Sequence, residues 1–141
     1  MVDVHDVKTR SRNMAAIKYK NTKPEIFLRK RLHALGFRYT LDNNTLPGKP
    51  DLVLPKYHAV IFINGCFWHA HSCHMFKIPK TRTDWWMQKL SRNKQRDREQ
   101  WCELNAAGWR VLVVWECAIR GRYKVMETEL LDTITHWLRT L

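Results

Sequence analysis

Apolar side chains at helical spacing predict the first strong helix of the chain. Leu28, Leu32 and Leu35 follow that spacing. The residues Thr-Lys-Pro-Glu at 22–25 have the form of a capping box with proline early in the helix, and Gly36 supplies a stop. We therefore expect a helix that runs between the capping box and this glycine.

Further segments of the chain also have helical character. A long polar segment can be capped by Thr83 or Asp84 and reaches Ala107, with Gly108 as its stop. Residues 123–138 form a closing amphipathic helix, whose apolar positions are Val125, Leu130, Ile134 and Trp137. Upstream of all of these, residues 8–20 are expected to form a basic arm or helix.

Short apolar runs bounded by turn residues predict strands. The expected strands are residues 37–41, 51–54, 59–63 and 109–115. The runs at 59–63 and 109–115 are continuously apolar, as in strands buried on both faces. With the helices placed before, between and after them, these strands predict an α/β domain with a mixed β-sheet flanked by helices on both faces.

Length and composition narrow the class of protein. The chain has 141 residues, so we expect residues 1–141 to form a single domain. No apolar run approaches the roughly 18 residues of a membrane span, and the N-terminus lacks the basic and apolar regions of a signal peptide. We therefore expect no membrane partner and a protein that works in the cytoplasm.

The charge of the chain points to a polyanion. There are 25 Lys and Arg against 13 Asp and Glu, a net charge of +12. Two basic blocks, 1–50 and 75–100, flank a neutral stretch at 51–74, and residues 101–141 are balanced. Nucleic acid is the favoured partner, and solvated helix faces are the alternative. The seven Trp suit base stacking, although most are expected in the core.

Cysteine and histidine cluster after the strand at 59–63. Five such residues fall within nine positions: Cys66, His69, His71, Cys73 and His74. Zinc prefers four tetrahedral sulfur and nitrogen ligands, and Cys66, His71 and Cys73 can supply three. Cys117 is the best fourth ligand, because adjacent strands would bring it beside the loop, whereas Cys102 is expected to be a buried helix thiol. The alternative is a set of reduced thiols and surface histidines.

A candidate acidic site precedes the same strand. Asp51 follows a Pro-Gly-Lys-Pro turn and opens a strand, an arrangement that resembles the Pro-Asp element of restriction-endonuclease-like nucleases. Those enzymes usually add Glu-x-Lys on the next strand, where this chain has Phe62, Ile63 and Asn64. Metal-dependent phosphodiester cleavage also needs a base, and His69 is near in sequence and titrates near neutrality. The alternative is that Asp51 is a turn or cap residue.

Several long motifs resemble one family. Residues 61–73, which include Ile-Asn-Gly-Cys-Phe-Trp-His, residues 9–14, residues 46–51 and residues 114–118 are similar to the very-short-patch repair (Vsr) DNA mismatch endonucleases. The similarity is colinear from about residue 3 to residue 138. It implies a restriction-endonuclease-like fold and a Mg²⁺-dependent nuclease that cleaves one strand of duplex DNA 5′ to the T of a T:G mismatch. Such mismatches arise when 5-methylcytosine deaminates.

The resemblance also assigns roles in catalysis and metal binding. It places Mg²⁺ on Asp51 and on the backbone carbonyl of Ile63, the general base on His69 and a supporting acid on Glu25. It places a structural zinc ion on four ligands, which are Cys66, His71, Cys73 and Cys117. At position 64 the chain has Asn64 where members of the family can have histidine.

The resemblance further implies how DNA is held. Side chains that insert beside the mismatch fall on Phe67, Trp68 and Trp86, with Met14 approaching from the other groove, and Lys89 and Asn93 fall on residues that hydrogen-bond the T:G pair. Residues 1–20 would contact DNA as a basic arm. We expect a monomer in the bacterial cytoplasm, associated with the nucleoid. Two alternatives stay open: a nicking nuclease of the same fold with another target, and a non-catalytic zinc-stabilised DNA-binding module.

Overall fold

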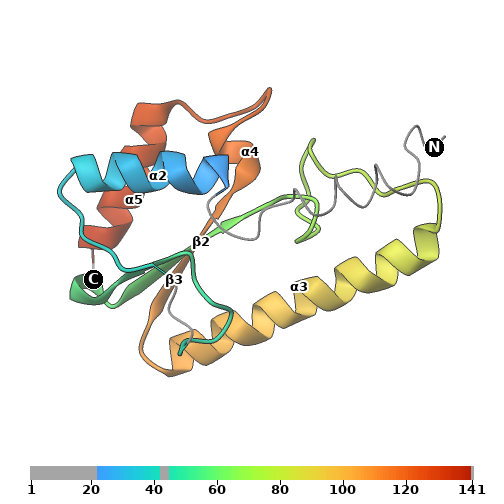
Figure 1. The fold of residues 1–141 in the computed structure, drawn as a ribbon, viewed down its shortest axis with the longest axis horizontal. Helices are drawn as coiled ribbons and strands as arrows, with labels where there is room; N and C mark the ends of the chain where they lie inside the picture. The colour runs from blue at the N-terminus through green and yellow to red at the C-terminus, as the bar shows by residue number, and fades with distance from the viewer. Residues whose placement is uncertain (1–21, 42–44, 141) are drawn as a thin grey trace, which may run out of the picture.

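The computed structural model describes residues 22–41 and 45–140, and in that part of the chain it forms a three-stranded sheet with helices on both faces (Figure 1). The strands are β1 (Leu52–Leu54), β2 (Ala59–Asn64) and β3 (Arg110–Trp115). The helices are α2 (Lys23–Ala34), α3 (Thr83–Ala106), α4 (Glu116–Ile119) and α5 (Glu127–Arg139), with the short 3-10 helix η1 (Pro55–Tyr57) between β1 and β2. No helix in the described ranges is both long and apolar enough to cross a bilayer.

The sheet is mixed and its order is β1-β2-β3. β1 and β2 pair antiparallel, with Val53 opposite Val60. β2 and β3 pair parallel, so that Asn64 lies opposite Trp115 at their carboxyl ends. A parallel pair needs a crossover connection, and α3 supplies it. The segments that follow β2 and β3 therefore both begin at the same edge of the sheet.

Alternate residues of the strands build two cores. On one face, Ile61 and its neighbours pack under α2 and α5, and the buried residues there include Leu28, Leu32, Leu130, Ile134 and Leu138. On the other face, Val60 and Phe62 pack with Leu104 near the end of α3. The helix-sheet-helix layering follows from this alternation, since each face of the central strand is apolar.

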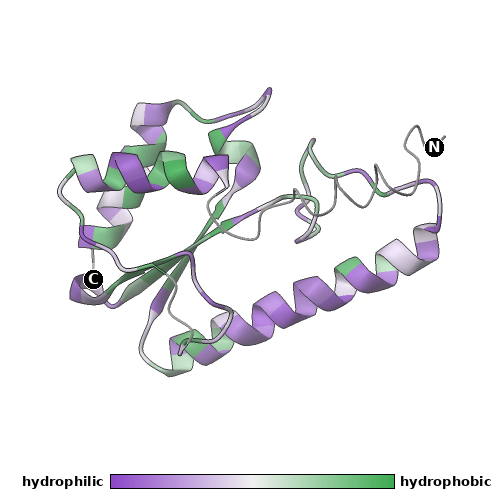
Figure 2. Cartoon of the chain, in the orientation of Figure 1, coloured by the Kyte–Doolittle hydropathy of each residue, from purple (hydrophilic) through white to green (hydrophobic). Residues whose placement is uncertain are grey.

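Only part of α3 covers the sheet. Its carboxyl-terminal end packs against the strands, while its amino-terminal half extends beyond them beside the segment 65–82 (Figure 1). The surface of this projecting half is predominantly hydrophilic, in contrast to the apolar strands (Figure 2). The long helix and the segment beside it therefore form an arm that stands away from the sheet.

Several expectations about the fold are confirmed. The mixed sheet, the helices on both faces and the strands at 52–54, 59–64 and 110–115 are present. Gly36 and Gly108 follow helix ends with φ values of +94°, a conformation that glycine adopts without strain. Thr22 caps α2, accepting a hydrogen bond from the backbone N–H of Glu25 at 3.4 Å.

Other expectations are wrong. Residues 37–41 do not form a strand, because β1 is only three residues long and Thr40 makes a single bridge to Val53. The last helix begins at Glu127 rather than at residue 123. β3 is mostly half-buried rather than buried, with only Val114 fully covered.

The start of α3 also differs from expectation. Arg82, in the left-handed conformation, occupies the N-cap position, and no side chain caps the helix. The Thr83 hydroxyl donates instead to the carbonyl oxygens of Pro79 and Lys80, at 2.8 and 3.1 Å. Thr83 therefore ties the helix to the preceding segment instead of capping it.

Candidate active site

Two carboxyl groups meet where β1 begins. Asp51 precedes β1, and its Oδ2 accepts a hydrogen bond from the backbone N–H of Ile63 on β2 at 2.6 Å. Glu25, only 2% exposed in the first turn of α2, lies against Asp51 and accepts a 2.7 Å hydrogen bond from Arg29. The structure therefore brings Asp51, Glu25 and Ile63 together.

Burial controls the charge of this pair. Desolvation raises the pKa of Asp51 to about 7, opposed by the hydrogen bond from Ile63. The Glu25 carboxylate raises the pKa further, and Arg29 lowers it. A buried pair of carboxylates is a site of concentrated negative charge, and its hard oxygen atoms are the ligands that Mg²⁺ prefers. The donor set therefore fits a divalent cation.

His69 lies in the segment that follows β2 and has an acidic partner on α3. Its Nδ1 lies 2.6 Å from Oδ2 of Asp97, and both side chains are mostly covered. Its backbone N–H donates to the carbonyl oxygen of Gly65 at 3.3 Å, which curls the chain back towards the end of β2. A carboxylate that accepts from Nδ1–H leaves Nε2 as the basic nitrogen.

Asp97 was not identified from the sequence as the partner of His69. It is 28 positions from His69, so no local motif connects the two residues. One signal was present: Leu90, Asp97 and Leu104 are spaced by seven, and both leucines are buried. An acid on the buried face of a polar helix needs a partner, and this is the property that could have identified Asp97.

The four predicted zinc ligands converge at the carboxyl edge of the sheet. One ligand atom from each of four residues lies within 4.8 Å of the others, and the residues are Cys66, His71, Cys73 and Cys117. The parallel register explains this, because Cys66 and Cys117 each follow the paired residues Asn64 and Trp115 by two positions. Cys102, by contrast, is exposed on α3, so its expected burial is wrong.

The protonation of the thiols is uneven. Burial raises the pKa of Cys66 to about 12 and also raises that of Cys117. Burial by itself would also raise the pKa of Cys73. Hydrogen bonds from the backbone, above all at Met75, and from the neighbouring thiols outweigh burial and lower this pKa overall. Burial lowers the pKa of His71, whose ring stacks on Trp115 at 4.1 Å. Three cysteines and a neutral imidazole fit zinc well.

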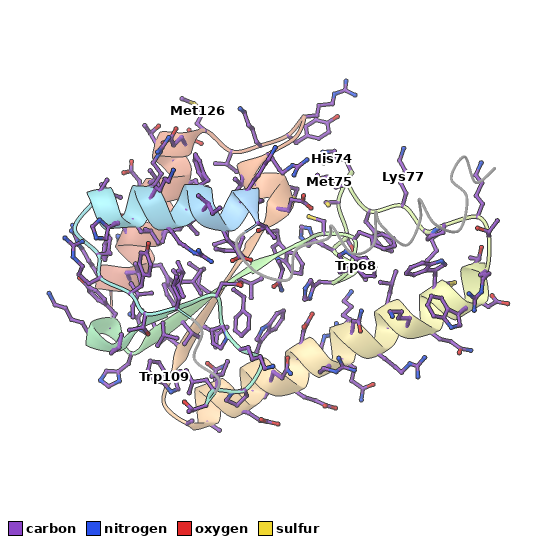
Figure 3. The ribbon with its side chains drawn as sticks, viewed as in Figure 1. Trp68, His74, Met75, Lys77, Trp109 and Met126 are labelled. Atoms are coloured by element: carbon purple, nitrogen blue, oxygen red, sulfur yellow. The ribbon has the colours of Figure 1, made fainter. Side chains whose placement is uncertain are left out.

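An aromatic cluster lies between this loop and α3. Phe67 contacts Trp68 and Trp86, with ring centroids 5.0 and 5.5 Å apart, and the two Trp rings are 6.0 Å apart. Phe76 lies 6.2 Å from Phe67. Trp68 lies in the segment beside α3, with His74, Met75 and Lys77 on the side turned away from the helix (Figure 3). The three predicted wedge residues therefore form one group.

The two predicted base-reading residues lie one turn apart on α3, and each is held by an aromatic residue. The Asn93 amide donates to the carbonyl oxygen of Trp68 at 3.2 Å. The Lys89 ammonium lies 5.2 Å from the ring centre of Trp85. Met14, the fourth predicted wedge, lies outside the described residues.

Asn64 occupies the last position of β2, directly before the loop that carries Cys66, His71 and Cys73. Its side chain is 5% exposed, and its Nδ2 has no hydrogen-bond partner within the part of the chain that the structure describes. A buried amide donor without a partner costs about 1–3 kcal/mol. A donor that remains available at this edge of the sheet can be used by a bound molecule.

Comparison with known proteins gives a consistent result. The model of the family described as DNA mismatch endonuclease Vsr matches residues 2–75. The DNA mismatch endonuclease Vsr of Escherichia coli K12 is 46% identical over 138 residues, which cover 98% of this chain and 88% of that protein. The type II nicking enzyme V.NmeAIP of Neisseria meningitidis is 45% identical over 86% of this chain and 87% of its own length. The nicking enzyme V.XorIIP of Xanthomonas oryzae is 44% identical over 75% of this chain and 78% of its own length. From this agreement along almost its whole length, the chain belongs to the Vsr family of DNA mismatch endonucleases.

Proposed function

We propose that this chain nicks duplex DNA 5′ to the T of a T:G mismatch, and that it thereby starts very-short-patch repair of deaminated 5-methylcytosine. One observation carries the proposal: the end of β2 and the loop after it gather a carboxylate pair, a histidine-aspartate pair and an aromatic cluster. Asp51 accepts a hydrogen bond from the backbone N–H of Ile63 at that strand end. His69, six residues after Ile63, pairs with Asp97. The proposed catalytic groups and the proposed wedge are therefore associated with one strand end and the loop that follows it.

Asp51 and the backbone carbonyl of Ile63 would hold Mg²⁺, with Glu25 supporting Asp51. Bound there, the ion would stabilise the negative charge that develops on the scissile phosphate. The carboxyl groups must be ionised to bind a cation. In the absence of a metal ion the pKa of Asp51 is about 7, so binding of the cation is expected to displace a proton near neutral pH. The Asn64 amide lies at the same strand end as a donor for a phosphate oxygen.

His69 acts as the general base. Asp97 accepts the Nδ1–H of the imidazole, which fixes the tautomer and orients the ring. Nε2 then takes a proton from the attacking water, and the resulting imidazolium is stabilised by the neighbouring carboxylate. Asp97 is a positioning residue in this mechanism, since it acts through His69.

The aromatic cluster selects the mismatch. Phe67, Trp68 and Trp86 are the wedge that enters the base stack, and Met14 approaches from the opposite groove. A mismatched step costs less free energy to unstack than a paired one, so a wedge favours T:G sites. The four-ligand cluster would hold a zinc ion, which would stiffen the loop that carries Phe67 and Trp68. Lys89 and Asn93 would hydrogen-bond the exposed pair.

The proposal also covers the domain, the N-terminal segment, the oligomeric state and the localisation. We propose that residues 1–141 are one restriction-endonuclease-like domain, that residues 1–20 contact DNA as a basic arm, and that the protein is a monomer. It would work in the bacterial cytoplasm, associated with the nucleoid. A second candidate function is general nicking with another target preference, favoured by the nicking enzymes among the relatives.

A nicking assay distinguishes these functions. Duplexes with a central T:G pair, varied in flanking sequence, and matched C:G duplexes are incubated with the protein and Mg²⁺. We expect a nick 5′ to the mismatched T and little cleavage of the matched duplex. Equal nicking of both duplexes would favour the second candidate. Salt-sensitive binding without any cleavage would leave only a DNA-binding module.

A further inference from the structure

The exposed indole of Trp85 contacts two cations, one at the N-cap of α3 and one within the helix. Arg82, one turn earlier, has its guanidinium carbon 4.6 Å from the centre of the indole, and Lys89, one turn later, has its ammonium nitrogen 5.2 Å away. Residues four apart share a helix face, which places Lys89 beside Trp85, whereas Arg82 reaches the indole from the left-handed N-cap position. Trp85 is 39% exposed, which places both contacts at the solvent boundary.

Trp85 differs from its neighbour Trp86. Trp86 packs with Phe67 and Trp68, the proposed wedge residues. Trp85 meets Trp86 edge-on at 4.9 Å, and its ring is engaged by cations. A base that stacks on that ring would compete with these charged side chains for the indole. The contacts of Trp85 therefore suit a residue that holds cations rather than one that enters the DNA.

The Lys89 side chain depends on this ring for its position. Lysine is long and flexible, and holding its ammonium group in one place costs rotamer entropy. Within the described parts of the chain, the indole of Trp85 is the partner that the structure gives to that ammonium group. Asn93, one turn later, is held separately, by the carbonyl oxygen of Trp68.

We propose that Trp85 is a positioning residue for mismatch recognition, because it holds the Lys89 ammonium where the T:G pair is read. The inference rests on the proposed function and goes beyond it by assigning a role to a residue outside the wedge and the catalytic groups. Two contacts then preorganise recognition: the indole of Trp85 holds Lys89, and the backbone carbonyl of Trp68 holds Asn93. Preorganisation lowers the cost of ordering these side chains when DNA binds.

Equilibrium binding without added Mg²⁺ tests the proposal. The measured quantity is the specificity ratio, the Kd for matched C:G duplex divided by the Kd for T:G duplex. In Trp85→Leu we expect this ratio to fall about threefold to fivefold, as for loss of one exposed cation–π contact. Trp85→Phe keeps an aromatic face and should restore most of the ratio. Met87→Ala removes another exposed α3 side chain and should leave the ratio unchanged.

A double-variant cycle separates positioning from a structural role. In a Lys89→Met background, Trp85→Leu should cause no further loss of the specificity ratio, because its effect passes through Lys89. The proton chemical shifts of the Lys89 Cε group provide a readout without DNA. They should be moved upfield by the indole ring, return towards random-coil values in Trp85→Leu and stay displaced in Trp85→Phe.

Three results would overturn the proposal: an unchanged ratio in Trp85→Leu, an equal loss of affinity for both duplexes, or an undiminished effect in the Lys89→Met background. Failure of the proposed function gives a different result. In that case the wild-type protein itself binds the two duplexes equally well. A wild type that prefers T:G together with an unchanged Trp85→Leu variant refutes only the role of Trp85.

Discussion

At the scale of single residues, the candidate site consists of pairs whose members are far apart in the sequence. Asp51 lies against Glu25, and His69 pairs with Asp97. Asp51, Glu25 and His69 could be predicted, because turn chemistry or a motif resemblance marks each of them. Asp97 could not be predicted in the same way, since a single acid within a charged helix has the same local pattern as a solvated residue.

The carboxylate pair predicts a conflict between stability and activity. In the folded protein the pKa of Asp51 is about 7, against 3.8 for the free side chain. The folded state therefore holds a proton that the unfolded state has lost, so this group makes stability fall as pH rises from about 4 to 7. Asp51→Asn keeps an oxygen for the Ile63 N–H and removes the charge. Without Mg²⁺ it should be more stable than wild type at pH 8, by on the order of 2 kcal/mol.

Urea unfolding at several pH values, without added metal, measures this difference. The gap between Asp51→Asn and wild type should close as the pH falls below the free value of 3.8, where Asp51 is protonated in both the folded and the unfolded states. The same variant should lose nicking activity while it still binds T:G duplex. A variant that is less stable than wild type at pH 8 would contradict the assigned electrostatics, and normal nicking would contradict the assigned metal ligand.

The His69–Asp97 pair predicts the effect of a neutral substitution. Asp97→Asn preserves the size of the side chain, but it can present an N–H to Nδ1 and favour the wrong tautomer of His69. We expect kcat for T:G nicking to fall about 10²- to 10³-fold with little change in duplex affinity. Single-turnover nicking and equilibrium binding measure the two effects separately. The neighbouring exposed residue Glu99 is a control, since Glu99→Gln should keep wild-type kcat.

At the scale of elements, the parallel pairing of β2 with β3 brings together the four-ligand cluster of cysteines and histidine. Both strands could be predicted from continuous apolar runs, and their parallel order brings Cys117 beside the loop that starts at Cys66. The prediction of a strand at 37–41 is wrong, and the reason again lies in how strands pair. A strand needs a partner of matching length, and β1 offers only three residues.

The cluster predicts that the loop after β2 depends on metal. Cys117→Ser removes one of four ligands, and purified protein should fall from about one zinc ion per chain to a small fraction of one. Amide hydrogen exchange in residues 65–82 should then accelerate, and affinity for T:G duplex should fall at least tenfold, because Phe67 and Trp68 of the proposed wedge lie on this loop. Cys102→Ser changes an exposed thiol on α3 and should retain zinc. Full zinc content in Cys117→Ser would exclude Cys117 as a ligand.

At the scale of the whole molecule, the layered sheet and the projecting arm have different compositions. The apolar cores lie on the two faces of the sheet, whereas most of α3 is hydrophilic (Figure 2). Basic and aromatic side chains lie together on the projecting half of α3 and the loop beside it. The charge blocks in the sequence indicated a polyanion partner. They could not indicate the arm, because its projection depends on how much of α3 the small sheet can cover.

This arrangement predicts that the position of charge, and not only its total, governs DNA binding. Arg92 and Arg96 are exposed on α3, three and seven residues after Lys89, whereas Lys56 and Arg139 lie at the opposite end of the sheet. Each phosphate contact contributes about 0.9 to the slope of log K against log salt. The double variant Arg92→Gln/Arg96→Gln should therefore reduce that slope by about 1–2 and weaken binding to matched and mismatched duplexes alike. Lys56→Gln/Arg139→Gln loses the same net charge and should keep the wild-type slope. If the two double variants change the slope equally, then the salt dependence of DNA binding is set by the net charge of +12 and not by charges on the arm.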